Sequence, residues 1–199
     1  MNKVITISRE YGAGGHTIGK RVAQELGIEI YDKDIVRETV RASGFETEVV
    51  QEEEEDVSKA STFLKSLCSS SVHYRDPQEV IHEVQTAVIL QFAKKGPCVI
   101  LGRCADDILR ESGLEALNIF IHADDLHRAV RISEMTGITN ATELQKLMAK
   151  KDSSRRNYYE HYTHKKWGDS HNYDLALDSG KLGVDLCVQM IVEAAKAGE

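Results

Sequence analysis

Prolines, aromatic residues and long apolar runs are all scarce in this chain. Only two prolines occur in 199 residues, and aromatic residues make up 6% of the total. No stretch is long and apolar enough to cross a membrane, and the opening MNKVITI enters a strand at once, so we expect neither a membrane partner nor a signal peptide. The cysteines show no paired spacing, which indicates reduced thiols in a cytoplasmic protein; they are Cys68, Cys98, Cys104 and Cys187.

Positive charge is also in deficit. The formal net charge is −7, from 25 basic and 32 acidic residues. A general nucleic-acid binder is not expected from such a chain, so local basic clusters must hold any phosphates. A hydrophobic content of 41% is enough for a full core, and the length suits one domain over 1–199 with room for a small insertion.

The most informative segment is ITISREYGAGGHT at 5–17, followed by the helical run IGKRVAQELG. Its apolar, β-branched start predicts a buried strand. Gly12, Gly14 and Gly15 permit positive φ angles and a close approach of the backbone to a ligand. A helix is predicted to begin near His16 or Thr17. Its first amides lack internal partners and its dipole is positive there, so a phosphate can bind. A plain glycine-rich turn is the alternative.

Two registers compete for the phosphate-loop motif G-x-x-x-x-G-K-[S/T]. The first begins at Arg9, so that Arg9 replaces the first glycine and Gly15 replaces the lysine. The second runs from Gly14 to Gly19-Lys20-Arg21 and keeps the lysine. Ile18 already belongs to the buried stripe of the helix, which the second register would have to unwind. We therefore favour the first register, in which the usual lysine is missing.

The rest of the chain alternates strands and helices. Continuous apolar strands in that alternation predict an α/β fold with a parallel sheet covered on both faces. We expect strands at 3–8, 29–31, 97–102, 117–122 and 175–178, and later helices at 34–42, 77–95, 103–111, 124–136, 141–162 and 181–197. The span from about 43 to 76 does not follow this alternation of strands and helices. Its acidic run at 52–56 is typical of a solvated helix face, and its serine patch is typical of a loop. The span could also be an excursion that covers a substrate.

Several charged side chains follow the predicted strands. Arg103 comes directly after the third strand, at the edge where open α/β sheets bind ligands. An ion pair with Asp106 or Asp107 is its alternative role. Asp32 and Asp106 are candidate carboxylates near the same edge, and each could instead cap the following helix. Thr17 is a candidate Mg²⁺ ligand or a first-turn residue of the helix.

Arginines also gather in the second half of the chain. Arg128 and Arg131 lie three residues apart and share a helix face, which is either functional or simply solvated. Arg155 and Arg156 belong to the basic and aromatic segment 150–169. We interpret that segment as a helical flap over a triphosphate, where excluding water suppresses hydrolysis. The histidines of this region form no complete metal-ligand pattern and are expected at the surface.

Together these residues resemble the cytidylate kinase-like family, a branch of the P-loop nucleoside monophosphate kinases. The resemblance covers nearly the whole chain and rests on ISREYGAGGHTIGKRVAQELG, YDKDIV, GPCVILGRCADDIL, FIHADDLHRAVRI and KKDSSRRNYYEHYTHKKWGDSHNYDLALDS. It implies a three-layer P-loop NTPase fold with a five-stranded parallel sheet of order 2-3-1-4-5. It also implies a monophosphate-binding excursion at about 43–76 and a lid at about 141–170.

The implied reaction moves the terminal phosphate of ATP to CMP or dCMP with Mg²⁺, with no nucleic-acid partner; the oligomeric state is left open. The resemblance assigns the ATP phosphates to Gly12, Ala13, Gly14, Gly15, His16 and Thr17. It assigns the acceptor to Asp32 and Arg103, and phosphoryl transfer to Arg128, Arg131, Arg155 and Arg156.

Two departures stand out, because Gly15 replaces the family's lysine and Cys104 replaces the aspartate of Gly-Arg-Asp. Arg9, His16 or Lys20 are the candidate replacements for the missing cation. A nucleotide-binding regulatory module and a kinase of a non-nucleotide hydroxyl are the alternative functions.

Overall fold

A five-stranded parallel sheet forms the centre of the molecule. The computed structural model describes residues 4–44 and 77–197. The strands are β1 (Val4–Arg9), β2 (Glu29–Tyr31), β3 (Cys98–Leu101), β4 (Ala116–His122) and β5 (Leu175–Asp178), and their order across the sheet is β2-β3-β1-β4-β5. Each neighbouring pair is parallel, with Ile5 opposite both Val99 and Leu117. The predicted α/β class and strand order are confirmed.

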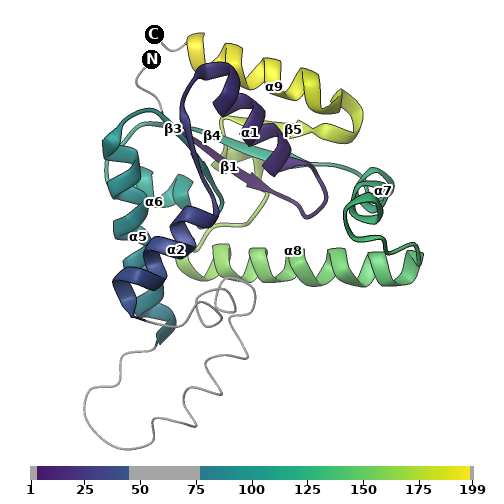
Figure 1. Cartoon of the computed structure of the whole chain (residues 1–199), viewed down its shortest axis with the longest axis horizontal. Helices are drawn as coiled ribbons and strands as arrows, with labels where there is room; N and C mark the ends of the chain where they lie inside the picture. The colour runs from purple at the N-terminus through teal and green to yellow at the C-terminus, as the bar shows by residue number, and fades with distance from the viewer. Residues whose placement is uncertain (1–3, 45–76, 198–199) are drawn as a thin grey trace, which may run out of the picture.

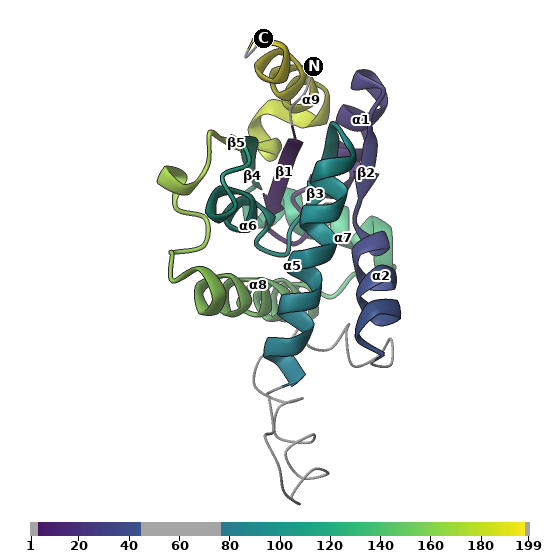
Figure 2. The same cartoon turned by 90° about the vertical axis from the view of Figure 1, so that its left-hand side faces the viewer.

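Helices cover both faces of this sheet (Figures 1 and 2). The helices are α1 (Gly15–Leu26), α2 (Lys33–Ser43), α5 (Pro77–Lys95), α6 (Ala105–Glu111), α7 (Asp125–Thr136), α8 (Ala141–Thr163) and α9 (Ser179–Ala197), with a short 3₁₀ turn at Ser170–Asn172. Helices α1 and α9 bury one face, where Ile18, Val22 and Ile191 pack on the strands. Helices α5, α6 and α8 bury the other, with Ile89, Leu109 and Tyr159. The sheet is therefore the middle of three layers, as expected.

Local signals in the sequence set most of these boundaries. Gly27 ends α1 in the left-handed conformation, with a φ of 65°. Asp124 and Asn140 cap α7 and α8 by accepting hydrogen bonds from the amides of His127 and Glu143. The expected excursion at 43–76, with its acidic run, its serine patch and Cys68, lies outside the described residues apart from its first two positions. Within the described ranges, no helix has the length and apolarity needed to cross a bilayer.

Candidate active site

The glycine-rich loop joins β1 to α1 at the carboxyl edge of the sheet. Helix α1 begins at Gly15 and includes buried Ile18 and Gly19, so the register through Lys20 would have to unwind the first turn of this helix, whereas the register that begins at Arg9 would not. Gly12 and Gly14 both have a φ of 80°. Gly14 is the N-cap of α1, and no side chain caps it. Because glycine has no side-chain acceptor, Gly14 itself does not compete with an anion for the amides at the start of α1.

Close packing explains why two loop positions must be glycine. A Cβ on Gly12 would lie 2.7 Å from Ile132 Cδ1, and a Cβ on Gly14 would lie 2.8 Å from Arg131 Nη1. Both positions also have the positive φ that side chains disfavour. The loop is thus held against α7 by contacts that only a backbone without Cβ can make.

Side chains from other elements bind the carbonyl groups of this loop. Arg155 of α8 donates from Nη1 to the carbonyl of Arg9 (3.0 Å). Arg131 of α7 donates from Nη1 to the carbonyl of Gly12 (2.9 Å). Ser179, at the start of α9, donates from its hydroxyl to the carbonyl of Ala13 (2.6 Å). A loop whose carbonyls are bound from outside in this way is held in one conformation before any ligand arrives.

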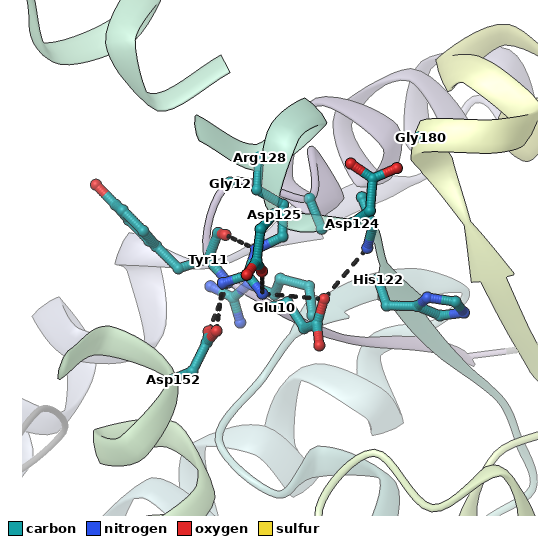
Figure 3. Close-up of polar contacts among 12 residues, drawn as sticks. Glu10, Tyr11, Gly12, His122, Asp124, Asp125, Arg128, Asp152 and Gly180 are labelled. Atoms are coloured by element: carbon teal, nitrogen blue, oxygen red, sulfur yellow. Dashed lines mark hydrogen bonds and ion pairs between the residues drawn. The ribbon is translucent and has the colours of Figure 1, made fainter. Parts of the chain in front are cut away.

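A buried arginine of α7, Arg128, also binds the loop (Figure 3). Its Nε donates to the carbonyl of Tyr11 (2.8 Å), its Nη1 lies 3.3 Å from Glu10 Oε2, and its Nη2 pairs with Asp152 of α8. Asp152 also accepts a hydrogen bond from the Tyr11 amide (2.8 Å). The Arg128 and Asp152 side chains are only 6% and 12% exposed. This network joins the loop, α7 and α8, and it was not predicted: sequence spacing assigned Arg128 to a functional or a solvated face.

A second cluster surrounds Asp32, just beyond β2. Arg103 Nη1 lies 3.4 Å from Asp32 Oδ1, Arg9 Nη2 lies 3.9 Å from the same oxygen, and His16 Nδ1 lies 3.1 Å from Oδ2. Burial of Asp32 alone would raise its pKa, yet the neighbouring cations hold that pKa below the ordinary aspartate value. The cluster brings together residues from the ends of β1, β2 and β3 and the start of α1. Arg103 thus pairs with Asp32, a partner that its predicted alternative role, an ion pair with Asp106 or Asp107, did not include.

The turn that carries Arg103 is conformationally unusual. Arg103 and Cys104 have φ values of 58° and 54°, so two consecutive residues with side chains are left-handed. Each such residue costs on the order of 1–2 kcal/mol, which the surrounding packing must offset. The Arg103 guanidinium also donates to the carbonyl of Leu101 (3.3 Å). This backbone turns the arginine back over the end of β3 toward Asp32.

Comparisons with known proteins identify the family of this chain and proteins with a similar fold. A sequence profile of the cytidylate kinase-like family matches residues 4–181. The chain belongs to this family. The cytidylate kinase of Methanococcus maripaludis is 30% identical over 123 residues, which are 60% of this chain and 68% of that protein. An uncharacterized protein from Eubacterium ventriosum has a TM-score of 0.72 at 27% identity and covers 98% of both chains. Family membership assigns the protein to the kinases.

A more distant solved structure shares only the fold. Shikimate kinase from Bacteroides thetaiotaomicron has a TM-score of 0.52 at 14% identity, and the match covers 98% of this chain and 99% of that one. The three-layer fold around a five-stranded parallel sheet is therefore the fold of the P-loop kinases.

Asp106 of this cytidylate kinase-like protein does not join the cations around Asp32. It is 2% exposed and accepts a hydrogen bond from the Tyr159 hydroxyl (2.8 Å). Burial raises the pKa of Asp106. The preceding Cys104, which replaces the family aspartate, is also buried, and its thiol pKa is raised by the same cause. Asp106 therefore lies beneath α8, where it contacts Tyr159, and not beside Arg103 and Asp32.

His16 and Thr17 both lie in the first turn of α1. With Gly14 as the second glycine of the motif G-x-x-x-x-G-K-[S/T], His16 occupies the position of the serine or threonine. The His16 side chain is 61% exposed and contacts Asp32. Thr17 is one residue further along the first turn of α1 and is exposed. Thr17 therefore stays a candidate Mg²⁺ ligand, with an accessible oxygen of the kind that Mg²⁺ prefers.

The arginines of the predicted lid differ from each other. Arg155 contacts the loop and lies over the ring of Tyr11, with its Cζ 5.6 Å from the centroid. Arg156 is exposed and lies over Trp167 instead, at 5.7 Å. Asp152 was missed entirely, although one carboxylate inside the basic run KKDSSRRN was a visible signal in the sequence. The predicted lid helix is therefore packed on the loop through Arg155 and Asp152.

Proposed function

We propose that this protein transfers the terminal phosphoryl group of ATP to a pyrimidine nucleoside monophosphate, CMP or dCMP. The observation that carries the proposal is the pairing of two neighbouring anion sites at one edge of the sheet. One is the glycine loop at the start of α1, with arginines bound around it. The other is the cluster of Arg103 and Asp32 at the ends of the next two strands. A donor and an acceptor phosphate need two such sites side by side.

The glycine loop fits the triphosphate of ATP. Gly12 and Gly14 carry no side chain and have positive φ angles, so the main-chain amides of the loop can approach phosphate oxygens closely. Arg131 uses one N–H on the Gly12 carbonyl, and a guanidinium carries five such donors. Mg²⁺, when bound, neutralises charge on the phosphates, and Thr17 is the residue we assign to it. Arg155, on α8, reaches the loop from the other side.

The cluster around Asp32 fits the acceptor. Arg103 is the group we assign to the phosphate of the monophosphate, because a guanidinium can grip a phosphate with two parallel hydrogen bonds. The depressed pKa keeps Asp32 ionised at neutral pH, so it orients Arg103 and accepts hydrogen bonds only. A carboxylate acceptor matches the amino group of cytosine.

The test is a panel assay of ADP release. Purified protein is given ATP and Mg²⁺ with CMP, dCMP, UMP, AMP, GMP and a set of small alcohols, while calorimetry measures ATP binding in parallel. We expect turnover with CMP or dCMP well above that with any other acceptor. ATP binding without turnover on any acceptor would favour a regulatory module. Turnover on an alcohol alone would favour a small-molecule kinase. Either outcome refutes the proposed acceptor.

A further inference from the structure

The loop carries an arginine where the motif has its first glycine, and a glycine where the motif has its lysine. We propose that these two positions have exchanged roles: Arg9 supplies the phosphate-site cation, and Gly15 supplies the space that Arg9 needs. This inference rests on the proposed phosphoryl transfer and names the group that replaces the missing lysine. The candidates left open by the sequence were Arg9, His16 and Lys20, and the structure separates them.

Arg9 and Gly15 are six residues apart in the sequence but touch in space. A Cβ built on Gly15 would lie 2.7 Å from Arg9 Cβ and 2.8 Å from Arg9 Cγ. These are closer than real Cβ atoms approach, and the atoms in the way belong to the rigid base of the side chain, not to its flexible end. A lysine at 15 and an arginine at 9 therefore exclude each other, which explains why both positions differ from the motif at once.

The Arg9 side chain then crosses the edge of the sheet. It passes the first residue of α1, and its Nη1 would overlap a Cβ on Gly102, at the end of β3. Its Nη2 lies 3.9 Å from Asp32 Oδ1. The guanidinium therefore lies between the loop and the Arg103–Asp32 cluster. That is the boundary between the two proposed phosphate sites, where charge shifts from donor to acceptor during transfer.

The base of Arg9 is fixed by the fold. Arg9 is the last residue of β1 and stands opposite Ile121 of β4 in the sheet. Its carbonyl accepts a hydrogen bond from Arg155 (3.0 Å). A cation mounted on a strand end in this way is oriented before the substrate arrives, which is the property that makes a fixed charge effective in catalysis.

Lys20 and His16, the two other candidate cations, are not mounted on a strand end between the two proposed phosphate sites. Lys20 is exposed on the second turn of α1, while its neighbour Gly19 packs on the sheet at Leu101 and Ile7. His16 is largely exposed and is held by Asp32. A guanidinium also offers two parallel donors to a phosphate, which an imidazole cannot do.

The test compares two variants of Arg9, one without the charge and one that keeps it. A variant of Lys20, on the neighbouring helix α1, is the control. Arg9→Gln keeps most of the side chain that packs on Gly15 but removes its charge. We expect it to lower kcat with CMP by roughly 100-fold or more and to weaken ATP binding. Arg9→Lys keeps the charge but not the planar fork, so we expect an intermediate kcat. Lys20→Ala is the matched control, and we expect wild-type kinetics from it. Thermal melting establishes that each variant is folded.

The exchange itself is tested by moving the cation back. Arg9→Gly alone should be as impaired as Arg9→Gln, and Gly15→Lys added to it should recover activity at least tenfold over Arg9→Gly. An Arg9→Gln variant with wild-type kcat and ATP affinity would overturn the proposal, and so would a folded double variant without recovery alongside an active Lys20→Ala.

Should wild-type protein phosphorylate none of the acceptors, the proposed function fails by itself. The Arg9 assignment is then still decided by calorimetry. Weaker ATP binding by Arg9→Gln than by wild type supports it, and equal binding refutes it.

Discussion

The buried pair of Arg128 and Asp152 gives a stability prediction that can be worked from the structure. Replacing Asp152 with alanine removes the acceptor of the Tyr11 amide and leaves the Arg128 guanidinium without its nearest counter-charge. Breaking a buried ion pair by removing one partner costs about 3–5 kcal/mol. Glu10 remains 3.3 Å from Arg128 and is partly exposed, so the lower end of that range applies. We expect a loss of about 3 kcal/mol.

Such a loss is measurable by thermal or urea unfolding. For a domain of this size it corresponds to a melting temperature lower by roughly 6–12 °C. Asp125→Asn is the matched control, because Asp125 lies 3.9 Å from the same guanidinium but is 78% exposed. We expect it to cost under about 0.5 kcal/mol. Equal melting temperatures for wild type and Asp152→Ala would refute the view that this pair anchors α8 to the loop.

Two further predictions concern the site, and a third concerns His82 of α5. Arg103→Ala should raise KM for the acceptor much more than KM for ATP; equal effects on both would refute its assignment to the acceptor. Gly14→Ala should abolish ATP binding in calorimetry, whereas Gly113→Ala, also at positive φ but in open space, should bind ATP normally. Stability should fall as pH drops from about 6.5 to about 4, because burial lowers the pKa of His82 to about 4 and the unfolded chain takes up the proton first. His82→Gln should flatten that part of the unfolding curve, and an unchanged slope would contradict the burial argument.

The sequence was sufficient for the fold because its signals are local. Apolar strands bounded by turn residues, and helices with capping residues, repeat along the chain, and the predicted boundaries lie within about two residues of those observed. The spacing of Ile18, Val22 and Leu26 also predicted that Ile18 belongs to the buried stripe of α1, which the structure confirms. The order of the strands came from the resemblance to a family, because no local signal states which strands become neighbours.

The candidate site was predicted less completely because its contacts are long-range. Nothing in the spacing of Arg128 and Asp152 pairs them, and only the packing of α7 against α8 brings them together. Asp106 and Asp107 are adjacent and both buried, and which of them accepts the hydrogen bond from Tyr159 depends on the rotation of α6. Cations were predicted individually at the strand ends, but their convergence on Asp32 depends on the order of strands in the sheet.

The four arginines expected to act on phosphate therefore divide by what they bind in this conformation. Arg128 and Arg131 bind loop carbonyls through α7, and Arg155 does so through α8, whereas Arg156 lies over Trp167. A carbonyl bound from outside fixes the orientation of its peptide unit, so the amides that remain can converge on one anion. In this arrangement α7 and α8 shape the loop through its main chain. Arg9, the last residue of β1, and Arg103, two residues beyond β3, then place their guanidinium groups near Asp32, where we propose that the two phosphates meet.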